Sequence, residues 1–448
     1  MERCRRFRSL GLVLLILGAA RTAAAQDLDQ IKAQLVAQQA ELARLRADLD
    51  AERKARAEEK PAIAGRRWGL VISGFVQADG VFYNQASQDE INGSTGAPLN
   101  EDRFEIRRAH LKTELTDGVL GGALEIEGTS ANDPAVRIFE AAFTARSRYV
   151  SGTIGMYRIP FGFENVQRDY ERFFLERSAV IRAMFPGEND LGVGVAGGWR
   201  FLRYAFSIMN GDPIGEKLFP YRDPNESKDF LGRAGIDTPL GSRASLRAGF
   251  SGLLGTGFHK GTPATKDMLV WRDANEDGIV QLSELQIIPG QPATASENFD
   301  RFAVGGDAGV SVVLPRLGEL NVYGELVWAS NLDRGIEPAD PIAAGRDHLR
   351  EFGWYVGFTQ ELGRLGMVGV RYDRYNPDAD AAEQVALNLI PVDRTYTTLA
   401  IAAGLRFGAA HRITLEYDRN TNALGRTMAG LPTTLGSDVL TLRCQVLF

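Results

Sequence analysis

The sequence predicts an all-β protein, a 16-stranded antiparallel transmembrane β-barrel preceded by a short N-terminal α-helical coiled coil. Three observations lead to this prediction. From residue 68 onward apolar and polar residues alternate with a period of two, as in strands that face lipid on one side and water on the other. Long and short connections alternate between the predicted strands. No stretch after residue 25 approaches the roughly 18 uninterrupted apolar residues of a membrane-spanning helix.

Residues 1–25 have the three parts of a secretory signal peptide. Four arginines lie between residues 3 and 8, an apolar segment of 11 residues follows at 10–20, and Ala23-Ala24-Ala25 supplies a cleavage site. The apolar segment is too short to cross a bilayer as a helix. We therefore expect an exported protein that is cleaved before Gln26. The alternative is a membrane anchor that is never cleaved.

The charge and the cysteines of the mature chain exclude several kinds of function. Without residues 1–25 the chain carries 46 Lys and Arg against 56 Asp and Glu, a net charge of −10. Such an acidic chain argues against nucleic acid as a partner. Cys4 lies in the signal peptide, so the mature chain keeps Cys444 alone, which excludes an intrachain disulfide and a Cys-based metal site.

Residues 26–60 are predicted to form a periplasmic coiled-coil segment. Residues repeat every seven positions at the two positions of a heptad that face the partner helix. The first position holds Leu28, Leu35, Leu42 and Leu49, and the second holds Ile31, the polar Gln38 and Leu45. Leu at the first seam position with Ile at the second favours three or four strands over two. Pro61 ends the helix and residues 61–67 form a linker. The alternative is a lone amphipathic helix that lies on the barrel or binds peptidoglycan.

Residues 68–448 contain sixteen candidate strands, an even number, as in single-chain bacterial barrels. The strands are predicted to begin near Trp68, Phe104, Leu120, Val136, Val150, Leu191, Leu202, Asp229, Arg243, Arg301, Glu319, Arg350, Gly366, Thr395, His411 and Ser437.

The connections between these strands alternate in length. After odd strands they are long, at 85–102, 158–190, 211–228, 256–299, 330–349, 376–394 and 421–436, with the shortest of this set at 128–135. After even strands they are tight, as at 116–118, 239–242, 315–318 and 408–410. Outer-membrane barrels have short periplasmic turns and long outer loops, so this alternation places the N-terminal segment in the periplasm.

Alternation within the strands also predicts which side chains face the lumen. In the last strand, for example, Leu440 and Leu442 share one face while Thr441 and Arg443 share the other. The apolar face is expected to contact lipid and the polar face water. The basic residues placed in the lumen by this argument are Arg108, Lys112, Arg247, Arg371, Arg412 and Arg443. Residues placed in this way are more often ordinary solvated wall residues than ligand contacts.

Several blocks of the barrel region resemble the phosphate-selective porin O and P family of Gram-negative outer-membrane porins. They are IGMYRIPFGFE (154–164), FLERS (174–178), DLGVGVAGG (190–198), FEIRRAHL (104–111) and the Met209-Asn210-Gly211 strand end. The resemblance implies a 16-stranded trimeric porin whose third long loop folds inward as a constriction. The chain departs from the family before the sixth strand, where a basic residue is common but the run is Gly187-Glu188-Asn189-Asp190.

The third long loop, 158–190, is the candidate constriction and anion-binding segment. Its basic residues are Arg158, Arg168, Arg172, Arg177 and Arg182. Arg suits phosphate because its planar fork donates two parallel hydrogen bonds to an oxyanion. The same loop carries acidic residues, so a structural network of salt bridges is the alternative. Asp169 and Arg172, three residues apart, could pair on a short helix.

The fifth long loop, 256–299, contains an EF-hand-like calcium motif that fits D-x-[DN]-x-[DN]-G-x5-E in full. The expected oxygen ligands are Asp273, Asn275, Asp277, Ile279 through its carbonyl, Gln281 directly or through water, and Glu284. A structural Ca²⁺ would order this long outer loop. The alternative is an acidic solvated loop that matches by chance.

Two other motifs do not support enzymatic chemistry. Residues 192–197 match G-x-G-x-x-G but lie in an alternating strand without a βαβ unit, and the four His residues have no metal-ligand spacing. The expected function is an outer-membrane porin for small hydrophilic solutes, selective for anions such as phosphate or pyrophosphate. A general or cation-tolerant porin and an envelope tether acting through the coiled coil remain alternatives. A lipid-hydrolysing barrel would need a Ser-His pair near the outer rim, and nothing points to one.

Overall fold

The structure is a computed structural model, and it describes residues 62–63, 66–67, 69–84, 87–91, 98–100, 102–131, 135–211, 225–385, 387–423, 425–426, 432–434 and 437–448. The chain divides into two units, 1–70 and 71–448. In the first unit, β1 (Ala62–Ile63) pairs with β2 (Arg66–Arg67). The predicted signal peptide and coiled coil lie outside the described residues.

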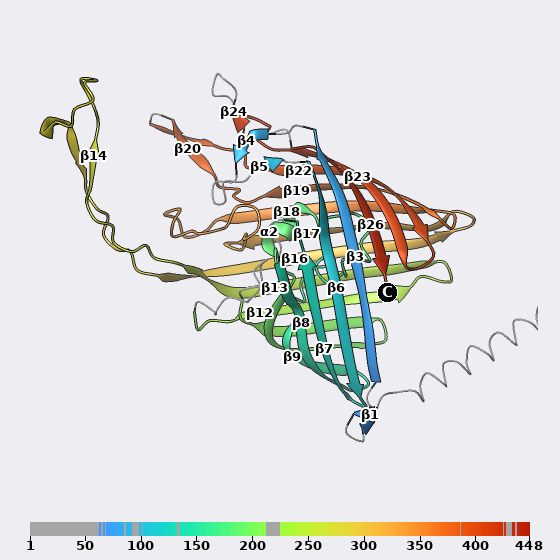
Figure 1. The fold of residues 1–448 in the computed structure, drawn as a ribbon. Coiled ribbons are helices and arrows are strands. Elements are labelled where there is room, and N and C mark those ends of the chain that lie inside the picture. Colours follow the sequence, from blue (N-terminus) through green and yellow to red (C-terminus); the bar gives the residue numbers. More distant parts are fainter. Residues whose placement is uncertain are drawn as a thin grey trace, which may run out of the picture. The chain divides into compact units, whose positions relative to one another are not determined.

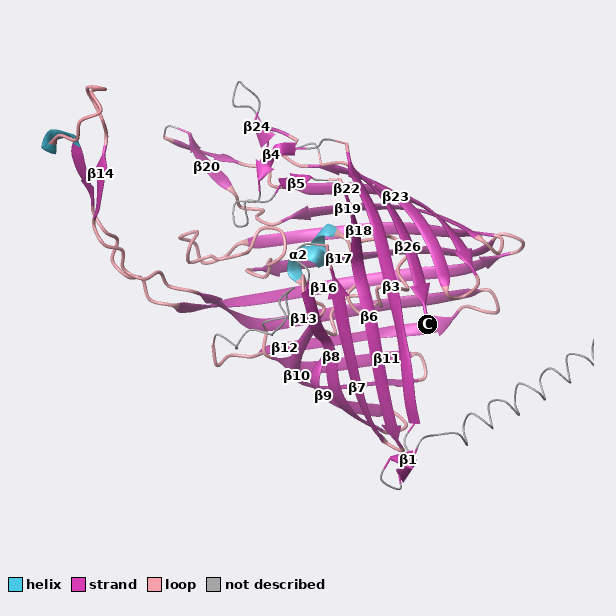
Figure 2. Cartoon of the chain, in the orientation of Figure 1, coloured by secondary structure: helices cyan, strands magenta, loops and turns pink. Residues whose placement is uncertain are grey.

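Sixteen antiparallel strands form one closed barrel in the second unit, with β9 and β10 completing the ring (Figures 1 and 2). The strands are β3 (Gly69–Tyr83), β6 (Arg103–Asp117), β7 (Leu120–Thr129), β8 (Ala135–Arg146), β9 (Val150–Arg158), β10 (Asn189–Trp199), β11 (Leu202–Met209), β12 (Asp229–Pro239), β13 (Ala244–His259), β16 (Glu297–Leu314), β17 (Gly318–Ser330), β18 (Arg350–Leu362), β19 (Gly366–Asn376), β22 (Tyr396–Phe407), β23 (His411–Thr421) and β26 (Val439–Leu447). The predicted number of strands is confirmed.

The predicted strand positions also agree with the structure. The largest differences are at the fifth long loop, where β13 extends to His259 and β16 begins at Glu297. These two strands pair in register as far as His259 opposite Glu297, so the ladder continues past the predicted strand ends.

The alternation of long and short connections is confirmed. The tight turns use glycine where the backbone needs a positive φ, as at Gly118 (φ 61°) and Gly408 (φ 69°). The long connections carry additional strand pairs: β4 (Ser87–Ile91) with β5 (Pro98–Asn100), β14 (Met268–Trp271) with β15 (Leu285–Ile288), β20 (Ala382–Val385) with β21 (Asn388–Pro391), and β24 (Gly425–Arg426) with β25 (Pro432–Thr433). In β14–β15 a 3₁₀ turn, η1 (Leu282–Glu284), precedes the second strand.

The two faces of the strands differ as predicted. In β23, the outward side chains of Ile413 and Leu415 are 39% and 44% exposed, whereas the inward side chain of Glu416 is 1% exposed. In β26, Leu442 lies outside and Arg443 lies inside. Outward apolar and inward polar side chains match a barrel with lipid around it and a polar interior.

Among the described residues, no helix is long and apolar enough to cross a membrane.

One part of the inner wall is apolar, contrary to the expectation that inward faces meet water. Inward side chains of β11, β12, β13, β16 and β17 form a buried cluster with the third long loop, made by Met209, Leu231, Leu253, Ala303, Val327, Ile159, Phe161, Val180 and Phe185. The loop's short helix α2 (Ala179–Met184) packs against β18 and β19 (Figure 2). The loop therefore covers this part of the wall.

Glycines on the inner wall make room for this loop. A Cβ at Gly353 would lie 2.6 Å from Cβ of Val180, and a Cβ at Gly369 would lie 2.8 Å from the ring of Phe173. Because real Cβ atoms do not approach so closely, these two positions require the smallest residue for the loop to pack in place.

Candidate constriction and solute pathway

Residues 159–188, here called the constriction loop, are held to the barrel wall through their backbone carbonyl oxygens. Arg443 Nη1 donates to the carbonyl of Leu175 at 2.7 Å, and Arg371 Nη1 donates to that of Glu176 at 2.7 Å. Arg412 Nη2 donates to the carbonyl of Arg172 at 2.6 Å. Three of the predicted lumen-facing arginines thus bind the loop itself.

Wall carboxylates bind the backbone N–H groups of the same loop. Glu325 Oε2 accepts from Phe163 N at 3.2 Å and from Glu164 N at 3.3 Å. Glu416 Oε2 accepts from Leu175 N at 2.9 Å. An irregular loop inside a barrel needs such partners because its buried backbone groups are costly to leave unpaired. The wall residues satisfy that need and fix the loop's position.

A second long connection braces the constriction loop. The backbone N–H groups of Arg334 and Gly335 both donate to the carbonyl of Ala183 at 2.9 Å, at the end of α2. Glu351 Oε1 accepts from Leu332 N at 2.7 Å, and Leu332 belongs to the apolar cluster. Burial raises the pKa of the neighbouring Asp333 carboxyl, although the backbone N–H groups that donate to it act in the opposite direction. The sequence predicted inward folding only for 158–190.

Three of the five predicted constriction arginines belong to a buried ion-pair network. Glu188 is the common partner: its carboxylate lies 2.6 Å from Arg158, 3.7 Å from Arg172 and 3.4 Å from Arg177. Arg172 also pairs with Asp169, but this pair lies in a turn and not on the predicted short helix. Two carboxylates, Glu188 and Asp169, therefore balance most but not all of the charge of these three guanidinium groups.

Arg168 and Arg182 are the exposed arginines of the constriction loop, and within the described part of the chain neither forms an ion pair, although both interact electrostatically with more distant acids. The Arg168 guanidinium lies 6.0 Å from the centre of the Tyr170 ring. Arg182 lies in the last turn of α2. The other exposed charge of this loop is Glu171, whose carboxylate accepts only from the backbone N–H of Arg168, at 3.4 Å.

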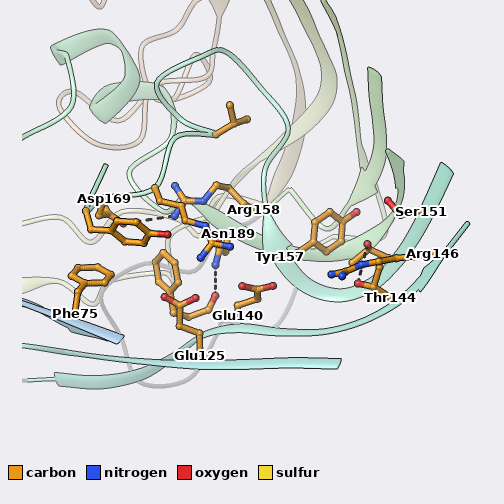
Figure 3. Close-up of a pocket in the computed structure, with 15 residues that line it drawn as sticks. Phe75, Glu125, Glu140, Thr144, Arg146, Ser151, Tyr157, Arg158, Asp169 and Asn189 are labelled. Carbon is orange, nitrogen blue, oxygen red and sulfur yellow. Dashed lines mark hydrogen bonds and ion pairs between the residues drawn. The ribbon is translucent and has the colours of Figure 1, made fainter. Parts of the chain in front are cut away.

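A cavity lies on each side of the constriction loop. The cavity on the short-turn side is lined by wall residues such as Thr144, Arg146 and Ser151 and by Arg168 of the loop. Figure 3 shows Arg146, Thr144 and Ser151 together at one end of this cavity. The cavity on the long-loop side is lined by residues from the loop and the wall, namely Glu176, Arg177, Arg182, Arg107, Arg371 and Arg443.

A third cavity, also toward the short turns, lies beside Phe163 of the loop. The guanidinium of Arg247 lies 4.8 Å from the centre of the Phe163 ring and has no acidic partner among the described residues. Arg203 also lines this cavity, whereas Arg233 pairs with Asp307 at 2.5 Å.

The remaining predicted lumen residues are also paired. Arg108 lies 3.4 Å from Asp169 of the constriction loop, and Lys112 lies 2.6 Å from Glu140 on the wall. Next to them His110 Nδ1 lies 2.6 Å from Glu125. The functional residues that sequence reasoning missed are the acids, above all Glu176, Glu188 and Glu325. Inward strand positions could have indicated Glu325, but nothing in the sequence pairs the loop acids with particular arginines.

The calcium motif lies in the loop between β14 and β15. Asp273 Oδ2 accepts from Gly278 N at 2.8 Å, and Glu284 accepts from the Trp271 indole at 3.1 Å and from Ala274 N at 3.2 Å. The Trp271 bond helps to lower the pKa of Glu284, which keeps its carboxylate ionised. Among the described residues no three His, Cys, Asp or Glu side chains are arranged to hold a metal. Calcium binding would therefore require Glu284 to leave Trp271, and it stays a prediction.

Comparison with known proteins supports the fold. No family model matches the chain, and no curated protein matches it. OprB of Pseudomonas putida is similar in structure, with 10% identity over 85% of this chain and 94% of OprB, and a TM-score of 0.53. The outer membrane channel DcaP of Acinetobacter baumannii is 11% identical over 85% of this chain and 97% of DcaP, with a TM-score of 0.50. An anion-selective porin from Comamonas acidovorans is 9% identical over 85% of this chain and 100% of that porin, with a TM-score of 0.50. At these identities the likeness is one of fold: the chain forms a 16-stranded porin-like barrel.

Proposed function

We propose that the protein is an outer-membrane porin for small hydrophilic solutes and that its pore prefers small anions such as phosphate. One observation carries the preference. Among the described residues that line the three cavities, the arginines that form no ion pair outnumber the acids that form none. These arginines are Arg146, Arg168, Arg182, Arg203 and Arg247, and the acids are Asp237 and Asp418. Transport through such a pore involves no chemical step.

The unpaired arginines act locally. A unit charge about 6 Å from a passing ion in water contributes about 0.7 kcal/mol, or roughly a threefold change in local ion concentration. Charges beyond a Debye length of about 8 Å are largely screened at physiological salt, so the net negative charge of the whole chain does not set the selectivity of the lumen. Arg158, Arg172 and Arg177 contribute less because each is paired with Glu188 or Asp169.

The preference expected from this arrangement is modest. The resemblance to phosphate-selective porins favours phosphate or pyrophosphate among the anions. The run of residues 187–190, where no basic residue precedes the sixth strand, departs from that family. Its Glu188 favours a broader anion preference because it pairs with three arginines of the loop. A general or cation-tolerant porin is the competing function, and the anion-to-cation permeability ratio separates the two.

The test is a pair of double variants with equal changes in charge. Arg168→Gln/Arg182→Gln removes the two unpaired arginines of the constriction loop. Arg316→Gln/Arg364→Gln removes two exposed arginines from short turns. The first variant should lower the anion-to-cation permeability ratio by roughly three- to tenfold in planar bilayers, since two local charges are lost. The second should leave it nearly unchanged, and equal effects would refute the proposed role.

We also propose a homotrimer in the outer membrane, assembled through the predicted coiled coil, with peptidoglycan as a further partner of that segment. The seven-residue repeat of residues 26–60 supports this. Deleting residues 26–60 should weaken the trimer on sedimentation in detergent. A stable, conducting trimer without the segment would instead favour a tether or spacer.

A further inference from the structure

The carboxylate of Glu176 lies among three arginines on the long-loop side of the constriction. Arg107 binds it with both arms of its fork, Nε to Oε1 at 2.8 Å and Nη2 to Oε2 at 3.1 Å. Arg443 Nη2 lies 3.1 Å from Oε1, and Arg108 Nη2 lies 3.5 Å from Oε2. This two-armed contact is the usual way in which arginine recognises any carboxylate.

The three arginines depend on Glu176 to different degrees. Arg443 also binds both oxygens of Asp79, at 2.8 and 2.7 Å, and Arg108 also lies 3.4 Å from Asp169. Within the described part of the chain, Glu176 is the one acid in contact with Arg107. Arg107 is therefore the arginine of the cluster whose acidic partner a second oxyanion can replace. Nη1 of Arg108 has no hydrogen-bond partner but is buried, so it is not reached from the lumen.

This cluster is open to the lumen. The side chains of Arg107 and Glu176 are 24% and 27% exposed, and both line the long-loop-side cavity together with Arg182. The backbone on either side of the Glu176 side chain is fixed, because Arg371 binds the carbonyl of Glu176 and Glu416 binds the N–H of Leu175. Rotation of the Glu176 side chain alone would expose Arg107 to a solute.

We propose that Arg107, Arg108 and Arg443 form a binding site for the carboxylate group of a passing solute, and that Glu176 is a built-in competitor for it. A solute carboxylate replaces the Glu176 carboxylate on Arg107 and accepts the same two hydrogen bonds, while the displaced Glu176 carboxylate, which stays ionised, turns toward the lumen. This inference rests on the proposed porin function and names a solute class for it.

The competitor makes physical sense in a pore. A tethered carboxylate has an effective local concentration in the millimolar range or above, so it weakens solute binding by mass action. Flux through a pore requires a site that attracts the solute but releases it again. Glu176 would keep three converging arginines from holding an anionic solute too tightly.

The experiment measures binding of succinate, as the carboxylate probe, to the detergent-solubilised full-length protein by calorimetry, and block of potassium chloride current by succinate in bilayers. Glu176→Ala removes the competitor and should strengthen succinate binding and block by at least tenfold. Glu171→Ala is the matched control, since it removes an exposed carboxylate of the same loop that forms no ion pair with an arginine among the residues the structure describes. It should change succinate binding less than threefold.

A second variant separates the site from a general effect of charge. Arg107→Gln/Glu176→Ala has the net charge of the unmodified protein but lacks the principal arginine, and it should lose the strengthened binding. Equal effects of Glu176→Ala and Glu171→Ala would overturn the proposal, as would tight binding in the double variant. Equal strengthening with inorganic phosphate would overturn the assignment to carboxylates. Calorimetry does not need a conducting pore, so failure of the porin function, read from conductance of the unmodified protein, is distinguishable from failure of this site.

Discussion

Arg443 of β26 and Leu175 of the constriction loop are joined by a 2.7 Å hydrogen bond from the guanidinium to the backbone carbonyl, across 268 residues of sequence. The same guanidinium binds both oxygens of Asp79 on the adjacent strand β3. Arg443 therefore positions the loop in addition to its place in the proposed carboxylate site. Arg371 and Arg412 also bind the loop, so a basic residue that faces the lumen does not by that fact contact the solute.

Replacing Arg443 should loosen the constriction. Arg443→Gln removes the bond to Leu175 and leaves the buried Asp79 carboxylate without its partner, and breaking a buried pair typically costs about 3–5 kcal/mol. We expect a lower unfolding temperature of the barrel, and a larger, noisier single-channel conductance because the loop is no longer fixed.

Arg406→Gln is the control for this change. Arg406 pairs with Glu361 at 2.6 Å but is 43% exposed and does not touch the constriction loop. Exposed pairs contribute about 0–1 kcal/mol, so conductance and stability should hardly change. Similar behaviour of the two variants would argue against Arg443 as an anchor of the loop.

The glycine at position 353 should be intolerant of even one methyl group. In Gly353→Ala the new Cβ would lie 2.6 Å from Cβ of Val180, so α2 must move away from the wall and into the lumen. Overpacking of this kind costs about 1–3 kcal/mol. We expect a reduced single-channel conductance.

Gly306→Ala provides the comparison, because a Cβ there meets nothing within 4 Å. It should conduct like the unmodified protein. Unchanged conductance in Gly353→Ala would show that the helix does not pack on the wall as described.

The fifth long loop offers an optical test of calcium binding. If Ca²⁺ binds, Glu284 must leave the Trp271 indole, and the tryptophan fluorescence should change on titration with Ca²⁺ and return with EDTA. Glu284→Gln, which removes the two-oxygen ligand, should abolish the titration in the millimolar range. A titration curve that is flat in the unmodified protein, or identical in both, would count against the site.

The sequence was sufficient for the barrel because its signals are local. Alternation of lipid-facing and water-facing residues sets each strand, and turn glycines such as Gly118 and Gly408 set the short connections. The covered inner wall also leaves a trace in the sequence, because alternation is lost there. In β17, the consecutive residues Val327, Trp328 and Ala329 are all apolar, and in the structure Val327 and Ala329 pack in the interior of the barrel.

The division of the arginines could not be predicted in the same way. Whether Arg177 or Arg182 is available to a solute depends on where Glu188 lies after the loop has folded against the wall. Those contacts join residues distant in the chain, and no local pattern encodes them. The five constriction arginines therefore look alike in sequence, and only the tertiary contacts separate Arg168 and Arg182 from the other three.

The sign of the zero-current potential across a planar bilayer under a tenfold gradient of potassium chloride tests the central claim most directly. If unpaired arginines set the character of the pathway, chloride crosses faster than potassium and the dilute side becomes negative relative to the concentrated side. A dilute side that becomes positive would show a cation-preferring pore and contradict the account.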